Sequence, residues 1–340
     1  MIPPELRGVC RRIRGMLYDK GGTQMRVFQI GRNDAGQRAD KFLCKACPKL
    51  PKSLLYKTFR KKDIKCNGRR IPPETFLQAG DVLQVYLPDD CFGTAQKPKP
   101  APVLPMPEIV YEDAQIALLK KPVNLPVHAD DRGSADTLAG RFLQYLAKTG
   151  AYDPAKEQSF TPALCNRLDR NTEGFVIGAK TAEALRTVNE MIRENRVTKR
   201  YLCITAGFPP KQQDTVSAYH RREEGQKAEI SSRPREGFKP IRTGYEVLQK
   251  HDDLALVLVT LHTGRTHQIR AQMAALGCPV LGDKRYGNRD ANRHYSISHQ
   301  LLAACILQLD VPAEGHLLSA LCGRTFSYTP EFCARYGFDI

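Results

Sequence analysis

The sequence has no long apolar run. None of its stretches approaches the roughly 20 apolar residues that a membrane-spanning helix requires. The first 24 residues likewise have no extended apolar core and no small-residue cleavage site, which argues against a signal peptide. We therefore expect a protein with no membrane partner.

The sequence also lacks a cysteine framework. Of its 11 cysteines, only Cys44 and Cys47 form a C-x-x-C pair, and no second pair or nearby histidine cluster completes a zinc site. An odd number of cysteines scattered through apolar segments is typical of reduced, buried thiols. These features predict a cytoplasmic protein with no bound metal.

Acidic side chains are scarce beside basic ones. Lysine and arginine total 52 against 36 aspartates and glutamates, which gives a net charge of +16 and a pI of about 9.4. Residues 1–90 carry 19 basic and 9 acidic side chains, so +10 of this charge lies at the N-terminal end. Such a balance is expected of a protein that binds a polyanion, and it carries no information on the fold.

A carboxylate stands between two arginines in the segment Asn166–Gly174. Asp169 lies between Arg167 and Arg170, just before the apolar, strand-like run 175–177. Neighbouring guanidinium groups favour an ionised carboxylate, which suits a nucleophile or a stabiliser of positive charge. An ordinary salt bridge at the end of a strand is the alternative, and this segment alone does not exclude it.

A second polar segment, Leu261–Arg270, follows the apolar run 254–261 and leads into a helix that Gly277 would end. Thr266 is the expected N-cap of that helix. Arg265 would then project from the turn beside the exposed amides of the first helical turn, a corner that attracts anions. Simple helix capping is the alternative role.

An aromatic residue lies between these two segments. Tyr201 belongs to the strand-like run 197–204, which follows an amphipathic helix expected over residues 182–193. Its ring could stack on a planar base, or it could be an ordinary core tyrosine.

Taken together, these segments resemble the signature motifs of the RluA family of pseudouridine synthases, in the same order and at similar intervals. The matching residues are Lys121–His128, Arg167–Asp169 with Thr172 and Gly174, Lys199–Tyr201, Gly264–Arg270, Gly282–Asp283 and Tyr286–Gly287. In addition, Leu301–Ala304 resembles part of the family's C-terminal helix. The resemblance runs from about Gln24 to near the C-terminus.

The resemblance implies an enzyme that detaches uracil from its ribose and reattaches it through carbon 5, without a metal or an organic cofactor. It implies that Arg167 fills the gap left in the RNA and that Tyr201 stacks on the extruded base. Asp169 would attack or stabilise the reacting nucleotide, and Arg265 would pair with Asp169. Whether Asp169 bonds to the base, bonds to the sugar or removes a ribose proton is left open.

The N-terminal end forms a separate basic segment. Helices are expected over residues 38–47 and 53–62, strands over 63–67 and 82–87, and a tight turn at Asn67-Gly68. Five basic side chains cluster around the second helix without interleaved acidic residues: Lys52, Lys57, Arg60, Lys61 and Lys62. A solvated charged face is the alternative to a binding surface.

This segment resembles the small RNA-binding module of ribosomal protein S-four, through the residues 38–43, 51–53, 60–62 and 64–68. Together with its Pro-Lys-Ser piece, the module is typical of the RluC-like branch of the family. That branch acts on large-subunit (23S) ribosomal RNA, so this RNA or an assembling large subunit is the expected partner. Phosphate contacts by the module would position the enzyme without selecting the uridine.

These patterns predict an α+β protein of four parts. Residues 1–24 form an extension, either a misassigned upstream start or a genuine basic arm, and are expected to be disordered or a lone amphipathic helix. Residues 25–90 form the small α/β RNA-binding domain, and residues 91–107, with five prolines, form an extended linker. Residues 108–340 form the catalytic domain, with a mixed, mainly antiparallel sheet flanked by helices.

Two other functions are compatible with part of the sequence. A non-catalytic RNA-binding or ribosome-assembly factor would keep the fold and the basic module, although intact Asp169, Tyr201 and Arg265 argue against this alternative. A glycoside hydrolase would need two carboxylates with separate roles, and the sequence offers Asp169 with no evident partner. Asp283 lies in a Gly-Asp turn and is expected to be structural. The default oligomeric state is a monomer.

Overall fold

The computed structural model describes residues 23–88, 103–129, 133–223 and 225–339. The expected N-terminal extension up to residue 22, and residues 91–102 of the expected proline-rich linker, lie outside these ranges. Across the described residues, every helix is too short or too polar to cross a bilayer.

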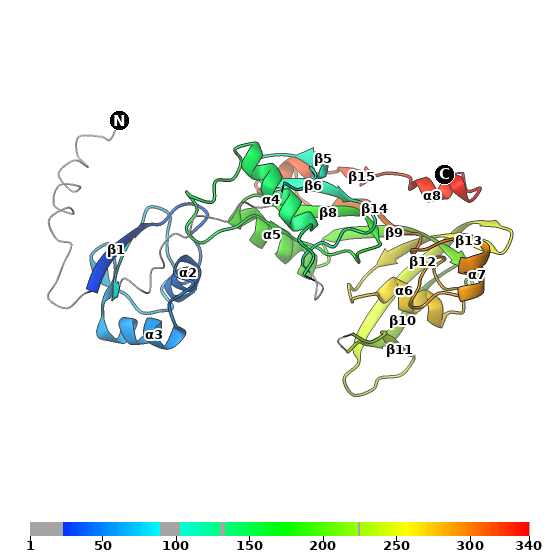
Figure 1. Cartoon of the computed structure of the whole chain (residues 1–340), viewed down its shortest axis with the longest axis horizontal. Coiled ribbons are helices and arrows are strands. Elements are labelled where there is room, and N and C mark those ends of the chain that lie inside the picture. The colour runs from blue at the N-terminus through cyan, green and yellow to red at the C-terminus, as the bar shows by residue number, and fades with distance from the viewer. Residues whose placement is uncertain (1–22, 89–102, 130–132, 224, 340) are drawn as a thin grey trace. The chain divides into compact units, whose positions relative to one another are not determined.

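The chain forms two compact units, drawn with their elements labelled in Figure 1. The first unit contains the described residues up to Val103 together with two short segments from later in the chain, Asp153–Thr161 and Thr181–Glu183. The second unit contains Leu104–Tyr152, Pro162–Lys180 and Ala184–Ile340.

The first unit is a small α/β fold. Its four-stranded antiparallel sheet has the order β1-β4-β2-β3, with the strands β1 (Thr23–Gln29), β2 (Ile64–Cys66), β3 (Arg69–Arg70) and β4 (Val82–Pro88). Two amphipathic helices, α2 (Ala39–Ala46) and α3 (Lys52–Lys61), place Phe42, Leu43 and Leu55 in its core. The predicted turn is present, since Asn67 and Gly68 both adopt positive φ between β2 and β3.

A buried carboxylate joins the later segment to the N-terminal part of this unit. Asp34 is 3% exposed, and its carboxylate accepts hydrogen bonds from the Ser159 hydroxyl at 2.6 Å and from Nε2 of Gln158 at 3.1 Å. A buried carboxylate needs such donors, and the segment 153–161 supplies them. This segment is therefore an integral part of the first unit.

The second unit is built on a large sheet with the order β11-β10-β12-β13-β9-β14-β8-β6-β5, with β15 beside β14 and β7 beside β8 (Figure 1). Its strands are β5 (Glu108–Glu112), β6 (Ile116–Lys121), β7 (Ala163–Leu164), β8 (Glu173–Ala179), β9 (Val197–Ala206), β10 (Gln213–Arg221), β11 (Glu229–Ser231), β12 (Lys239–His251), β13 (Leu254–Leu261), β14 (Leu302–Leu309) and β15 (Thr325–Ser327). The β8–β14 pair is parallel and the other pairs are antiparallel. The predicted mixed, mainly antiparallel sheet is therefore confirmed.

Helices cover both faces of this sheet. They are α4 (Leu138–Lys148), α5 (Ala182–Arg193), α6 (Gln268–Ala275), α7 (Arg289–His294) and α8 (Glu331–Arg335), with a short 3-10 helix at Ser319–Leu321. Strand alternation separates the two faces. In β9, Tyr201 and Cys203 pack with α4 and α6 in one core, whereas Leu202 and Ile204 pack with α8 in another.

Most predicted elements are present, but one is of the wrong type. The helix predicted over 182–193 is α5, and the strand-like run 197–204 is part of β9. By contrast, Leu302–Ala304 begins strand β14 and is not helical. This run of small apolar residues pairs with both β8 and β9 in the centre of the sheet, where burial on both faces gives no alternating pattern.

Gly174 gives a test of how closely β8 and β14 approach. Its φ is +123°, and a Cβ added there would lie 2.3 Å from the Ala304 carbonyl oxygen. We expect Gly174→Ala to lower the free energy of unfolding by about 2–4 kcal/mol, because both the backbone and the contact become strained. Chemical denaturation would measure the change.

The matched control is Gly264→Ala, since a Cβ at Gly264 would meet nothing within 4 Å. This variant should change the free energy of unfolding by no more than about 1 kcal/mol. Equal stability of the two variants would contradict the close packing of β8 against β14.

Candidate active site

Asp169 lies in a tight turn that leads into strand β8. The Thr172 amide donates a hydrogen bond to the Asp169 carbonyl oxygen at 3.0 Å, which closes the turn. The Thr172 hydroxyl is buried and accepts a hydrogen bond from Nε2 of Gln300 at 3.3 Å. The turn thus presents the Asp169 side chain, which is 22% exposed, from a rigid support.

Arg270 is the partner of Asp169. Its Nη1 donates to Oδ2 of Asp169 at 2.8 Å, while its Nε and Nη2 donate to the two carboxylate oxygens of Asp283 at 2.6 and 2.9 Å. The guanidinium is 9% exposed and lies between two carboxylates. The predicted pairing of Asp169 with Arg265 is therefore wrong.

The start of helix α6 explains the difference. The helix begins at Gln268, and its N-cap is His267 rather than the predicted Thr266. Oε1 of Gln268 accepts hydrogen bonds from the Arg265 amide and the Thr263 hydroxyl, which folds the preceding turn over the helix end. Arg270 consequently lies in the buried first turn of α6, whereas the Arg265 side chain is exposed and makes no hydrogen bond or ion pair with the described residues.

Asp283 anchors this ion-pair network. Burial favours the protonated form of Asp283, but hydrogen bonds from Arg270 and from the amides of Arg285 and Tyr286 outweigh it and lower the pKa. Burial also opposes the charge of Arg270, yet its two carboxylate partners keep its pKa raised. The structural role expected for Asp283 is thus also electrostatic, since it holds the cation that faces Asp169.

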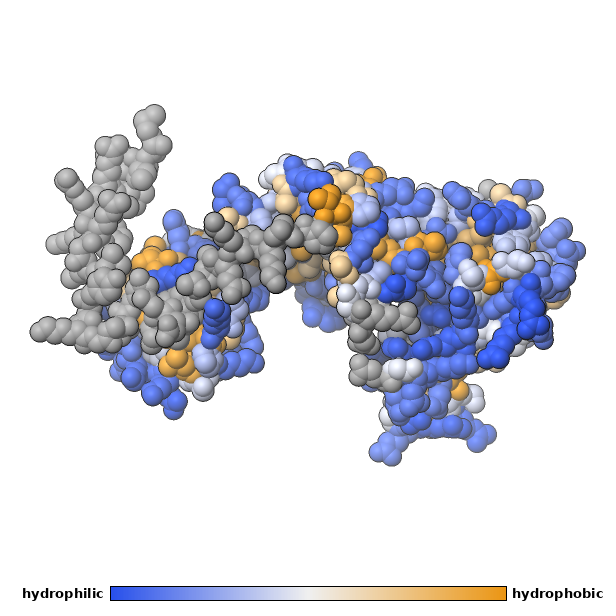
Figure 2. Space-filling view, viewed as in Figure 1, coloured by the Kyte–Doolittle hydropathy of each residue, from blue (hydrophilic) through white to orange (hydrophobic). Residues whose placement is uncertain are grey.

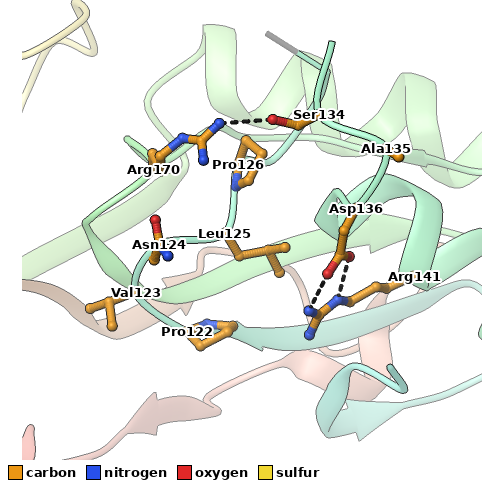
Figure 3. Close-up of a pocket in the computed structure, with 10 residues that line it drawn as sticks. All are labelled: Pro122, Val123, Asn124, Leu125, Pro126, Ser134, Ala135, Asp136, Arg141 and Arg170. Carbon is orange, nitrogen blue, oxygen red and sulfur yellow. Dashed lines mark hydrogen bonds and ion pairs between the residues drawn. The ribbon is translucent and has the colours of Figure 1, made fainter. Parts of the chain in front are cut away.

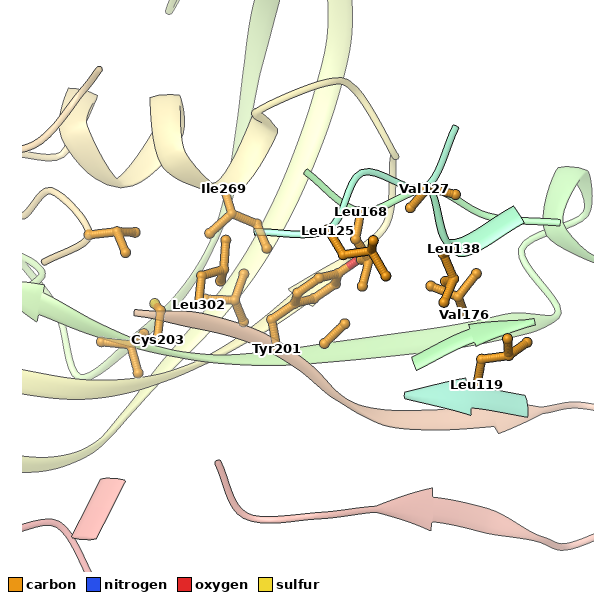
Figure 4. Close-up of a cluster of buried hydrophobic side chains, with 14 of the residues drawn as sticks. Leu119, Leu125, Val127, Leu138, Leu168, Val176, Tyr201, Cys203, Ile269 and Leu302 are labelled. Carbon is orange, nitrogen blue, oxygen red and sulfur yellow. The ribbon is translucent and has the colours of Figure 1, made fainter. Parts of the chain in front are cut away.

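Tyr201 lies in the core that the sheet shares with α6. Its side chain is 6% exposed, and Figure 4 shows the ring among Leu125, Leu168 and Leu302. Burial, followed by the charge of Asp169, raises the pKa of its hydroxyl. The core position is established, and stacking of this ring on a base stays a prediction.

Lys121 supports the Asp169 turn from inside the protein. Its side chain is fully buried, and Nζ donates to the carbonyl oxygens of Pro122, Leu125 and Arg170 at 2.7–2.9 Å. Burial lowers the pKa of Lys121 to about 7, while the charge of Asp169 acts in the opposite direction. This lysine ties the 122–125 loop to the residue that follows Asp169.

A polar pocket of about 430 Å³ lies beside this loop (Figure 3). Two arginines in its wall are fixed by partners: Arg141 bonds to both oxygens of Asp136, and Arg170 donates to the Ser134 hydroxyl at 2.8 Å. The lining residues are Pro122, Val123, Asn124, Leu125, Pro126, Ser134, Ala135, Asp136, Arg141 and Arg170. None of the three predicted catalytic residues lines it.

The residues predicted to bind RNA are all exposed. Arg167 projects from the turn that carries Asp169. The five basic side chains predicted on the second N-terminal helix lie on α3 and its C-cap, and none of them forms an ion pair with a described residue: Lys52, Lys57, Arg60, Lys61 and Lys62. Such unpaired cations are available to an anion.

Neither metal ligands nor a disulfide marks the site. Among the described residues there is no group of three or more His, Cys, Asp or Glu side chains suited to a metal ion. The described cysteines are free thiols, and Cys44 and Cys47 belong to the core region of the first unit.

Sequence reasoning missed Arg270, His267 and Tyr286 as members of the site. The sequence of α6 gives little signal for Arg270, because the buried residues of this helix also include the polar Gln268 and Gln272. A buried arginine in such a helix requires carboxylates nearby. His267 and Tyr286 lie in the matching motifs, but the motifs do not show that the two side chains meet, since their contact depends on the path of the loop after α6.

Comparisons with known proteins identify the family of the chain. A family model described as RNA pseudouridylate synthase matches residues 115–275. Ribosomal large subunit pseudouridine synthase C from Salmonella typhimurium is 31% identical over 304 residues, which covers 86% of this chain and 91% of that protein. The protein of the same name from Vibrio cholerae is 31% identical over 323 residues, covering 88% and 96%.

A solved structure supports the fold. Human RNA pseudouridylate synthase domain containing 4 matches with a TM-score of 0.53 at 23% identity, covering 68% of this chain and 94% of that chain. The level of identity to the bacterial relatives, maintained over most of both sequences, shows common descent. The chain belongs to the RluA family of RNA pseudouridine synthases.

Proposed function

We propose that this chain converts specific uridines of large-subunit (23S) ribosomal RNA into pseudouridine, with Asp169 as the reacting carboxylate. The observation that carries the proposal is the 2.8 Å bond between Asp169 and the buried Arg270. Family membership supports the reaction, and the names of the bacterial relatives support the RNA class.

The reaction is an isomerisation that balances without a co-reactant. The bond between ribose C1′ and uracil N1 breaks, the base turns, and C1′ bonds to C5. The hydrogen on C5 leaves to solvent as N1 gains one. A carboxylate can serve this sequence by attacking the nucleotide or by removing a ribose proton, and in either case it must act as an anion or base.

The target uridine must leave its stack to reach Asp169, which costs a few kcal/mol. We propose that Arg167, exposed on the same turn, occupies the space that the uridine leaves. Tyr201 would stack on the extruded base once the surrounding leucines make room. Arg265 has a free guanidinium beside the start of α6, and we assign it a phosphate contact in place of the pairing with Asp169.

We further propose that the first unit binds RNA through the basic side chains on α3 and its C-cap, as the resemblance to the ribosomal S-four module implies. This α3 cluster consists of Lys52, Lys57, Arg60, Lys61 and Lys62. The five exposed basic side chains of this cluster have no acidic partners among the described residues. Contacts of this kind add affinity and fix register without reading sequence. The free thiols suit a reducing cytoplasm, where we expect the protein to act as a monomer.

A non-catalytic RNA-binding or assembly factor is the competing function. It would keep the α3 cluster but would have no need of a buried cation shared by two carboxylates. Such a network lowers the stability of the fold, because each buried charge loses its hydration. A protein without catalytic activity would gain nothing in return. Turnover decides between the two functions.

Release of tritium from RNA labelled at uridine C5 tests the reaction directly. Wild-type protein should release tritium, and Asp169→Asn should lower the rate by more than about a hundredfold, because an amide is neither a base nor a nucleophile of comparable strength. Asp290→Asn is the matched control, since Asp290 is 90% exposed and paired only with Arg293 on the surface. Rapid release by Asp169→Asn would remove Asp169 from its assigned role, and no release by the wild type on large-subunit RNA would overturn the proposed function.

Salt dependence tests the role of the α3 cluster. The triple variant Lys52→Gln/Lys57→Gln/Lys61→Gln should raise KM at physiological salt and flatten the slope of log affinity against log salt by about 2–3, with kcat unchanged. The control triple Lys156→Gln/Arg193→Gln/Arg293→Gln removes the same charge from exposed side chains that already have acidic partners. Equal slopes for the two triples would refute an RNA contact at α3.

A further inference from the structure

A series of hydrogen bonds leads from the loop between β10 and β11 to His267, whose ring faces Asp169. At the loop end, the Ala228 amide donates to the Tyr286 hydroxyl at 2.7 Å. Arg285 holds the same loop, because its Nη1 and Nη2 donate to the carbonyl oxygens of Gln226 and Gly225 at 3.0 and 3.4 Å. The loop is therefore fastened to the turn that follows Asp283.

The hydrogen bonds of Tyr286 determine which ring nitrogen of a neutral His267 carries the proton. The Tyr286 hydroxyl accepts from Ala228 and lies 3.0 Å from Nδ1 of His267, so its single proton is free to be donated to that nitrogen. On this bonding pattern a neutral His267 ring carries its own proton on Nε2. Nε2 faces Oδ2 of Asp169 at a distance of 3.7 Å.

The His267 ring is kept uncharged by its surroundings. Burial lowers its pKa to about 4, and the nearby cations Arg270, Arg222 and Arg285 act in the same direction against the charge of Asp169. A neutral imidazole with its proton on Nε2 turns a donor toward Asp169 without competing with the positive charge of Arg270. It also contacts the Tyr286 ring edge to face, with ring centres 5.6 Å apart.

Helix capping does not account for this placement. His267 is the N-cap of α6, but its side chain makes no capping hydrogen bond, and its φ of 61° is an unusual backbone conformation for a residue other than glycine. His220 of β10 fixes the same turn, because its ring nitrogen Nε2 lies 3.1 Å from the Thr266 carbonyl oxygen. The hairpin thus contacts the turn before α6 through His220 and the turn after Asp283 through Ala228.

Both donors around Asp169 converge on one of its oxygens. Nη1 of Arg270 and Nε2 of His267 each face Oδ2, which leaves Oδ1 available to a reacting nucleotide. The distance of 3.7 Å is too long for a hydrogen bond, and a small shift of the ring would bring it near 2.9 Å. Catalytic contacts commonly tighten in this way when substrate binds.

The hairpin offers RNA a strongly basic surface. Its projecting end is largely hydrophilic (Figure 2), and its exposed cations include Arg222, Lys227, Arg233, Arg235 and Lys239. RNA phosphates bound by these side chains would influence the position of the loop whose Ala228 amide bonds to Tyr286.

We propose that Tyr286 and His267 are positioning residues that align the Asp169 carboxylate when RNA engages the β10–β11 loop. This inference rests on the proposed function. It links the binding of RNA at this loop to the alignment of the Asp169 carboxylate.

Single-turnover tritium release at saturating RNA tests the connection. Tyr286→Phe removes one oxygen and should slow the chemical step about 10- to 100-fold, because misplacement of a reacting group by a fraction of an ångström is costly. KM should change less than about threefold. His267→Phe should slow the step similarly, and His267→Gln, which retains a donor, should recover part of the rate.

Matched controls remove the same groups elsewhere. Tyr336→Phe removes a hydroxyl that makes no hydrogen bond within the described residues, and His294→Gln replaces an exposed imidazole. Both controls should stay within about twofold of wild type. Thermal melting of each variant separates loss of fold from loss of alignment, and Tyr286→Phe is expected to melt close to wild type.

A double-mutant cycle completes the test. If the two residues act in one series, Tyr286→Phe/His267→Phe should be no slower than the worse single variant. Additive losses, an effect confined to KM, or Tyr286→Phe at the wild-type rate would overturn the inference while leaving the proposed function intact. Absence of release by the wild type and the controls would instead signal failure of the proposed function.

Discussion

A buried guanidinium shared by two carboxylates organises the second unit. Arg270 donates to Asp283 through Nε and Nη2 and to Asp169 through Nη1, so one planar group fixes both anions. Arginine suits this position because its fork forms several directed bonds at once and does not lose its proton. Without the two carboxylates, a cation that is 9% exposed would be left largely unhydrated. Removing either carboxylate would therefore leave a buried cation only partly paired.

The fold brings these three residues together from distant positions in the chain. Asp169 and Arg270 are 101 residues apart, whereas Asp283 lies 13 residues beyond Arg270 in the turn after α6. The close approach of β8 to β14 at Gly174 fixes the turn that carries Asp169. Lys121 holds the same turn through its hydrogen bond to the Arg170 carbonyl oxygen. The core around Tyr201 then joins α6 to the same face of the sheet. Packing thus supplies the precision that the chemistry requires.

The sequence predicted those features that depend on local patterns. Apolar periodicity located α5, and the Asn67-Gly68 pair located a hairpin turn, because each signal is contained within its own element. The helix expected at Leu301–Ala304 is a central strand, since small apolar residues buried on both faces carry no period. The pairing of Asp169 with Arg265 failed for a different reason: nothing local distinguishes an arginine before a helix from one in its first turn. Contacts across a hundred residues, such as the approach of His267 to Asp169, require the fold itself.

We propose that Arg270, through its fork, holds Asp169 in a reactive position. The most direct measurement is the single-turnover rate of tritium release at saturating RNA for Arg270→Lys beside Arg265→Lys. Lysine keeps the charge but cannot make all three bonds, so Arg270→Lys should react more than about 100-fold more slowly than wild type, and Arg265→Lys less than about tenfold more slowly. A near-normal rate for Arg270→Lys together with a large loss for Arg265→Lys would contradict the account.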